Sequence, residues 1–80
     1  MTRRQVVVDE SVSLSLGKYL DEPAALAEFM NAIDALAGNP RPAGSVPWGP
    51  MMSRLHIGPY RVLYEISQEE IRVRRVDRLR

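Results

Sequence analysis

The sequence predicts an α+β domain, with helices in its first half and strands in its second half. Two observations lead to this class. Apolar residues recur at helical spacing between residues 23 and 37, and from residue 51 onward apolar and polar residues alternate, as in strands with one buried face. Helices and strands segregated in this way are typical of α+β folds. The 80 residues have room for one domain, spanning residues 1–80.

The first 20 residues contain one clear element and one ambiguous element. Gln5–Val8 is a β-branched run and predicts a strand. Residues 11–16 fit two patterns. Their apolar side chains alternate with serines, as in a strand, but Val12 and Leu16 also lie on one helical face with Tyr19. Asp9 or Ser11 is suitably placed to cap a helix at this point.

A helix is predicted over residues 23–37. Pro23 suits the first helical position, and Gly38 supplies a stop at the C-terminal end. The apolar stripe of this helix consists of Leu26, Phe29, Met30, Ile33 and Leu36. Residues 38–50 are so rich in Pro and Gly that a helix or a central strand is excluded. We expect this segment to be a rigid, partly extended connector.

Three strands are predicted after the connector, over Met52–Ile57, Tyr60–Ile66 and Ile71–Arg78. Gly58–Pro59 marks a tight turn between the first two strands, and residues 67–70 form a second turn. Short turns of this kind join neighbouring antiparallel strands, so we expect a three-stranded meander. The inward face of its middle strand is expected to carry Tyr60, Val62, Tyr64 and Ile66.

The composition excludes several classes of protein. The absence of Cys excludes disulfide scaffolds and Cys-based zinc sites, and a single His without an acidic cluster argues against a protein-built metal site. The longest apolar run near the N-terminus, Val6–Val8, is far shorter than the roughly 20 residues that span a bilayer. We therefore expect a small soluble intracellular domain with no cofactor, no metal and no membrane partner.

The net charge of +1 conceals an uneven distribution. Residues 1–40 contain three basic and six acidic residues, a net charge of −3, whereas residues 41–80 contain eight basic and four acidic residues, a net charge of +4. All of the basic residues except Lys18 are Arg, whose planar guanidinium matches phosphate and stacks on bases. The half that carries the strands is therefore a candidate phosphate-binding surface, although Arg-rich solvated strand faces explain the same numbers.

Residues 39–44, 54–66 and 71–78 together carry a more specific pattern. A helix ends in Asn-Pro, a loop and a basic strand follow, and then Gly58-Pro-Tyr-Arg-Val-Leu-Tyr64 leads into a final β-rich strand. Over residues 24–78 the chain resembles the RelE/ParE superfamily of type II toxin–antitoxin toxins. The resemblance implies a four-stranded, mostly antiparallel sheet with two helices packed on one face and a concave basic face opposite. It also implies a cognate antitoxin whose extended segment wraps the toxin.

The resemblance implies three alternative functions. The favoured one is a RelE-like mRNA interferase, a cytoplasmic endoribonuclease that cleaves mRNA on the ribosome by attack of the 2′-OH without a metal, and whose antitoxin complex binds operator DNA. The second is a ParE-like inhibitor of DNA gyrase, which binds without catalysis. The third is a catalytically weakened member that acts through antitoxin binding.

The same resemblance assigns site residues. Arg61, in the Tyr-Arg pair, is expected to stabilise charge on the scissile phosphate, while Arg54 binds phosphate and eases deprotonation of the 2′-OH. Arg78 is expected at the phosphate or the leaving group, and His56, on the strand face of Arg54, is the candidate for proton transfer. Further RNA-binding candidates are Arg72, Arg74 and Arg80, of which the first two are predicted to share a strand face with Arg78.

Other interpretations of these residues stay open. Arg61 is also suited to a structural ion pair with Glu65, and Trp48 either stacks on a base or, as we favour, caps the core from a rigid loop. The pattern departs from the family near the C-terminus, where Leu79 stands at the usual arginine position. We expect the tail that often carries a catalytic Tyr in the family to be absent.

Overall fold

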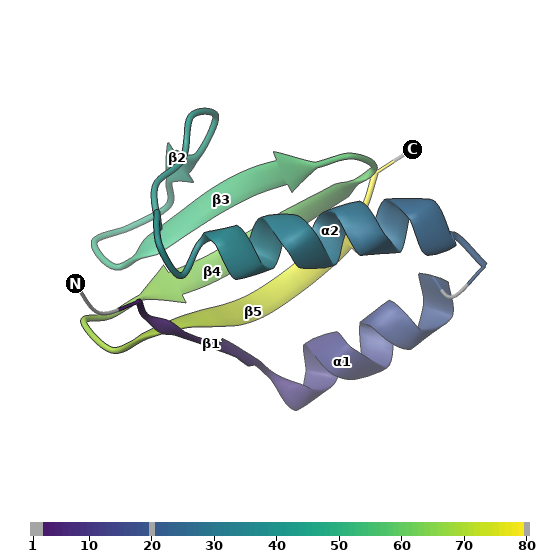
Figure 1. The fold of residues 1–80 in the computed structure, drawn as a ribbon, viewed down its shortest axis with the longest axis horizontal. Coiled ribbons are helices and arrows are strands. Elements are labelled where there is room, and N and C mark those ends of the chain that lie inside the picture. Colours follow the sequence, from purple (N-terminus) through teal and green to yellow (C-terminus); the bar gives the residue numbers. More distant parts are fainter. Residues whose placement is uncertain (1–2, 20, 80) are drawn as a thin grey trace.

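The protein, described here by a computed structural model of residues 3–19 and 21–79, has the expected α+β fold (Figure 1). Within these residues, the helices α1 (Glu10–Leu16) and α2 (Pro23–Ala35) cover one face of a five-stranded sheet. The strand order is β1-β5-β4-β3-β2. One strand more than expected is present, because two residues of the Pro-rich connector also pair with the sheet.

Residues 11–16, whose pattern fits both a strand and a helix, are helical and belong to α1. Strand β1 (Gln5–Val8) has the predicted bounds and pairs in parallel with β5 (Glu70–Arg78) at one edge of the sheet. The chain then turns into α1, which a 3₁₀ turn extends over Gly17–Tyr19. Asp9 occupies the N-cap position of α1, but its side chain makes no capping hydrogen bond.

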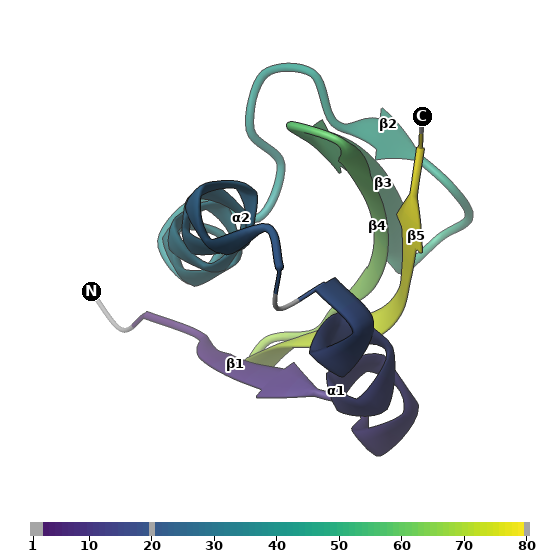
Figure 2. The ribbon, with the colours of Figure 1, turned by 90° about the vertical axis from the view of Figure 1, so that its right-hand side faces the viewer.

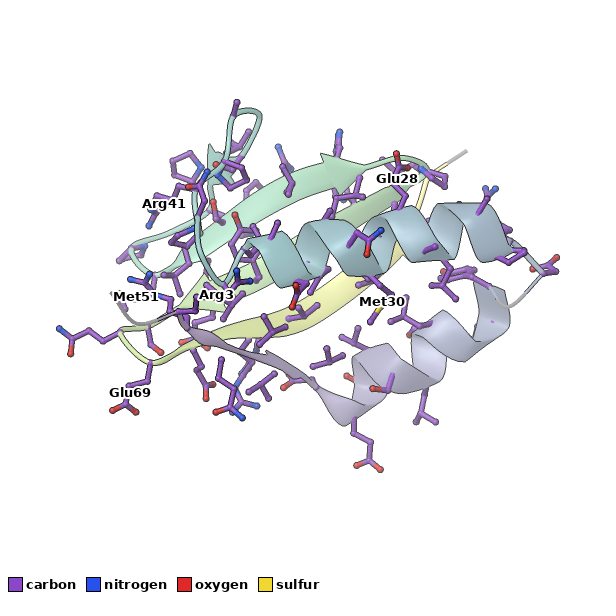
Figure 3. The ribbon with its side chains drawn as sticks, viewed as in Figure 1. Arg3, Glu28, Met30, Arg41, Met51 and Glu69 are labelled. Atoms are coloured by element: carbon purple, nitrogen blue, oxygen red, sulfur yellow. The ribbon has the colours of Figure 1, made fainter. Side chains whose placement is uncertain are left out.

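Helix α2 begins at Pro23 as predicted and ends at Ala35, two residues before the predicted end. Phe29, Ile33 and the following Leu36 are buried. The helical spacing also predicts Met30 in the buried stripe, but this side chain is 47% exposed. It projects from α2 on the side nearer to α1 (Figure 3), so its prediction as a core residue is wrong.

The meander comprises β3 (Met52–Ile57), β4 (Tyr60–Ile66) and β5, paired antiparallel as expected. Gly58 adopts a φ of 56° in the turn between β3 and β4, a left-handed conformation that glycine adopts without strain. The short strand β2 (Val46–Pro47) pairs with β3 at the other edge of the sheet. The ladder between β4 and β5 has a bulge at Leu63/Tyr64, which the regular alternation of the sequence does not predict.

The core lies between the helices and the inner face of the sheet. Its fully buried strand residues include Tyr60 and Tyr64, as predicted, together with Val62, Ile71 and Val73. The Tyr64 hydroxyl donates a hydrogen bond to the Pro40 carbonyl oxygen at 2.7 Å. This bond ties the start of the connector to the centre of the sheet.

Figure 2 shows the sheet curving around α2, so that this helix lies on its concave side. The opposite face, here called the outer face, is consequently convex as a whole. The expectation of a concave outer face is therefore wrong, because the sheet coils around the helix that covers it. In the part of the chain that the structure describes, no helix is long and apolar enough to cross a membrane.

Candidate functional site

The outer face is built from the strand residues that alternate with the buried ones. The strand registers place His56 opposite Arg61 and Arg61 opposite Asp77, which gives one row across β3, β4 and β5. A neighbouring row consists of Arg54, Leu63 and Arg75. Directly opposed residues in antiparallel strands lie about 5 Å apart, so these two rows bring three of the basic candidates, Arg54, His56 and Arg61, together with Arg75.

A hollow of about 250 Å³, here called the outer pocket, lies over these two rows and is walled by Trp48 from the connector. Its lining residues are Trp48, Arg54, Arg61, Leu63, Arg75 and Asp77. The guanidinium of Arg54 lies over the Trp48 ring, with 4.6 Å between Cζ and the ring centroid, a cation–π contact. Trp48 is 54% exposed, so the prediction that it caps the core is wrong.

Asp77 is the only acidic residue that lines the outer pocket among the described residues, and two guanidiniums share its carboxylate. Oδ2 lies 3.4 Å from Arg61 Nη2 and 3.1 Å from Arg75 Nε. The alternative pair considered for Arg61, with Glu65, does not form in the described residues. Four residues along a strand separate two Cα atoms by about 13 Å, whereas Asp77 lies directly across the ladder.

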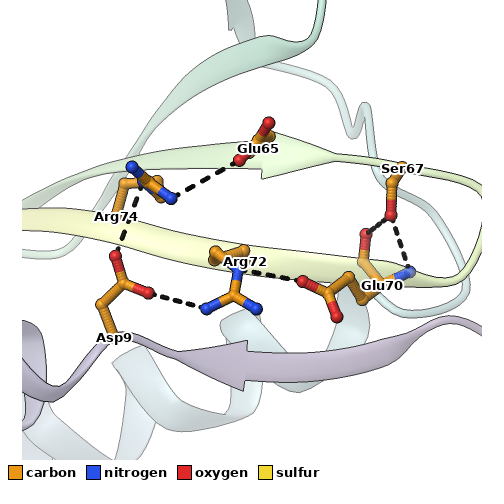
Figure 4. A network of polar contacts seen from close by, with 6 residues as sticks. All are labelled: Asp9, Glu65, Ser67, Glu70, Arg72 and Arg74. Atoms are coloured by element: carbon orange, nitrogen blue, oxygen red, sulfur yellow. Dashed lines mark hydrogen bonds and ion pairs between the residues drawn. The ribbon is translucent and has the colours of Figure 1, made fainter.

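A second cluster on the outer face, here called the ion network, surrounds Arg72 and Arg74 (Figure 4). Arg72 donates from Nη1 to Asp9 Oδ1 at 3.0 Å and from Nε to Glu70 Oε2 at 2.9 Å. Arg74 lies 3.5 Å from the other Asp9 oxygen and 3.7 Å from Glu65 Oε1. The hydrogen bond to Asp9, with the charge of Glu70, raises the pKa of Arg72 above its ordinary value.

Arg78 lies apart from both clusters. It sits opposite the buried Tyr60 in the ladder, and its guanidinium binds both carboxylate oxygens of Glu22, at 2.6 and 2.9 Å. This bidentate pair raises the pKa of Arg78 and lowers that of Glu22, in each case mainly through the hydrogen bond. The predicted face shared with Arg72 and Arg74 is wrong, because the bulge adds a residue to β5 and reverses the alternation beyond it.

The structure thus brings Arg54, His56 and Arg61 together and does not bring Arg78 to them. Arg80 lies outside the described residues. Sequence reasoning did not assign Arg75 and Asp77 to the site, since only the strand register reveals them as neighbours of Arg61 and Leu63. In residues 3–19 and 21–79, no group of three His, Cys, Asp or Glu side chains is arranged to hold a metal ion.

A second hollow, of about 370 Å³, lies between α2 and β3 and is separate from the outer pocket. Most of its lining is apolar, and Glu28, Asn39 and His56 also border it. Glu28 reaches over the turn between β3 and β4, where its carboxylate would collide with any Cβ at Gly58 (Figure 3). Gly58 is thus required for its backbone conformation, whereas the flexible Glu28 side chain would only have to move aside for a larger residue.

Comparison with known families gives one match. The model of a family described as "ParE toxin of type II toxin-antitoxin system, parDE" matches residues 14–80. The matched region includes every residue of the outer pocket, whereas Asp9 of the ion network precedes it. Neither curated proteins nor solved structures give a significant match.

Proposed function

The chain belongs to the ParE toxin family of type II toxin–antitoxin systems, and we propose that it acts by binding DNA gyrase and inhibiting it without catalysis. Membership of this family implies a cognate antitoxin as its partner. The gyrase target is what the ParE-like branch of the superfamily implies, although the sequence resemblance by itself favours the RelE-like branch. It places the action of the toxin in the cytoplasm.

The observation that carries this proposal is that, among the described residues, every outer-face arginine except Arg54 pairs with a carboxylate of the chain itself. Stabilising a transition state requires cationic groups that are already aimed at the position where negative charge develops. Arg61, the strongest candidate for that role, instead contacts Asp77, and Arg72 and Arg74 contact Asp9. A scissile phosphate would have to displace these carboxylates, so the face is poorly prepared for RNA cleavage.

One observation favours the alternative function, a ribosome-dependent mRNA endoribonuclease. Arg54, His56 and Arg61 lie together on one face, beside the exposed Trp48 ring. An imidazole is suited to proton transfer near neutral pH, and two guanidiniums are suited to a phosphate. This alternative would add the ribosome and mRNA as partners. Binding of operator DNA by the antitoxin complex is compatible with either function.

The test compares two assays on the purified chain. We expect DNA supercoiling by gyrase to be inhibited and mRNA programmed on ribosomes to remain intact. The variant Arg61→Ala should inhibit gyrase as the natural chain does, provided that its circular dichroism spectrum is unchanged. Glu69→Gln, at an exposed position in the turn before β5, serves as a matched surface control.

Other results would contradict the proposal. Cleaved mRNA with normal supercoiling, and loss of that cleavage in Arg61→Ala, would establish the nuclease alternative. Normal supercoiling together with intact mRNA, in a chain that still binds its antitoxin, would indicate the weakened member that acts only through its partner.

A further inference from the structure

We propose that the outer pocket binds the phosphate monoester of a nucleotide, and that Asp77 is a built-in competitor for this site. The inference goes beyond the proposed function, because a toxin that binds gyrase needs no nucleotide of its own. It rests on the shape of the pocket, on the groups that line it and on the position of one carboxylate.

The outer pocket combines cationic and aromatic groups around a small apolar floor. Arg54, Arg61 and Arg75 supply three guanidiniums, Leu63 lies between them in the ladder, and Trp48 forms a wall. Its volume of about 250 Å³ is just below the roughly 300 Å³ at which pockets for drug-sized ligands begin. The space therefore suits one compact charged group, with any attached ring lying against Trp48.

Asp77 occupies the position in which an external anion would be bound. Its carboxylate contacts Arg61 at 3.4 Å and Arg75 at 3.1 Å, distances typical of loose ion pairs. The three arginines and this single carboxylate leave an excess of two positive charges. Asp77 therefore satisfies only part of the cationic charge, and the pocket retains an attraction for a further anion.

A phosphate monoester fits this excess better than a carboxylate does. Exchanging the Asp77 carboxylate for another carboxylate brings no electrostatic gain, whereas a phosphate monoester carries about 1.5 to 2 negative charges at neutral pH and offers three acceptor oxygens. Guanidiniums bind such oxygens in bidentate fashion. Since half of the Trp48 surface is exposed, its ring can also stack on a base, which favours a nucleotide over free phosphate.

The ion network on the same face shows why the site is confined to the outer pocket. There, Arg72 and Arg74 face three carboxylates, those of Asp9, Glu65 and Glu70. The local charge is negative by one, so an incoming phosphate would be repelled. The contrast also supplies a control, because Glu65 is an outer-face carboxylate that does not line the pocket.

Fluorescence of Trp48, the single Trp of the chain, reports directly on the pocket. The purified protein is titrated at low salt with adenosine 5′-monophosphate, with adenosine and with inorganic phosphate. We expect a saturable change with the monophosphate, a weaker response to phosphate and none to adenosine. Asp77→Asn should bind the monophosphate about tenfold more tightly, since it removes a charge close to the site. Arg75→Gln should bind it more weakly.

The matched control is Glu65→Gln, which removes one negative charge from the same face and should leave the affinity unchanged. Equal tightening in Glu65→Gln and Asp77→Asn would overturn the role of Asp77 as a competitor. The absence of a saturable response to the monophosphate in the natural chain, or an equal response to adenosine, would overturn the site. The titration contains no gyrase, so its failure leaves the supercoiling result unaffected. If Asp77→Asn misfolds, titration of the natural chain and of Arg75→Gln still tests whether the outer pocket binds the monophosphate.

Discussion

Two regions of the outer face, the ion network and the outer pocket, both combine arginines and carboxylates from β4 and β5, yet they differ in charge. In the ion network, two arginines meet three carboxylates, and every charge has a partner. In the outer pocket, three arginines share Asp77. The difference teaches that an arginine becomes available to a ligand through local imbalance. The uneven charge of the two halves of the sequence does not by itself reveal where that imbalance lies.

The boundary between the two regions is the bulge in the ladder of β4 and β5. Arg74 and Arg75 are consecutive, and both are exposed, which a regular strand would not allow. Arg74 turns toward Asp9 and Glu65 in the ion network, whereas Arg75 turns toward Asp77 in the outer pocket. One extra residue thus supplies a cation to each region.

The largest effect on this comparison is expected from Tyr64→Phe. The variant removes the hydrogen bond to the Pro40 carbonyl, which anchors the connector that carries Trp48, and should lower the free energy of unfolding by about 1 kcal/mol. Urea unfolding measures the loss, and Trp48 fluorescence anisotropy should fall as the pocket wall loosens.

The control for this variant is Tyr60→Phe. Among the described residues, the buried Tyr60 hydroxyl has no hydrogen-bond partner, and burial raises its pKa, so its removal should not destabilise the protein. Equal destabilisation by both variants would mean that the bond to Pro40 contributes nothing specific.

A smaller effect is expected from Asp9→Asn, which breaks the ion network at the carboxylate that Arg72 and Arg74 share. The urea midpoint should fall less than in Tyr64→Phe, because partly exposed ion pairs contribute little. The loss should shrink at high salt, since salt screens such pairs. A salt-independent loss would instead assign the effect to packing. Trp48 fluorescence should stay unchanged, because the outer pocket does not depend on Asp9.

The smallest effect is expected from Glu22→Gln, whose pair with Arg78 lies outside both regions and serves as a reference. The hydrogen bond from Arg78 lowers the pKa of Glu22 below its ordinary value of 4.5 in the folded protein. The stability that this pair contributes is therefore present above pH 4.5 and lost as pH falls through the lowered pKa.

Urea midpoints measured from about pH 6 to pH 3 check this sign. The difference in urea midpoint between the natural chain and Glu22→Gln should be largest near about pH 6 and should disappear toward about pH 3. Glu28→Gln, within the helix α2 that Glu22 precedes, is the control for general loss of a carboxylate. A difference that grows as pH falls would contradict the lowered pKa.

The sequence predicts the regular elements of this fold well, because their spacing carries the information. Tyr60 and Tyr64 alternate with polar residues and are buried as expected, and β1 has its predicted bounds. The superfamily resemblance is confirmed by the family match over residues 14–80. Local periodicity identified the buried faces of the strands, although it wrongly placed Met30 of α2 in the core.

The candidate site was less predictable, since it depends on pairing between strands. The alternation of β5 predicts one face for Arg72, Arg74 and Arg78, and the bulge overturns this. The contact between Arg54 and Trp48 requires the connector to fold back over the sheet, for which the sequence has no periodic signal. The roles in catalysis or RNA binding that the resemblance assigns to these arginines stay predictions.

The bulge also predicts at which position the length of β5 can vary among relatives. Arg74 is the unpaired residue in β5, so its deletion would remove the bulge and make the strand regular. Val73 and Val76 would still face the core, and Asp77 would still lie on the outer face. Deleting a different residue of β5 would shift the register of the residues on one side of the deletion by one. Their apolar side chains would then turn from the core toward water. Relatives with a shorter final strand are thus expected to lack this residue, and an alignment should place its gap at position 74.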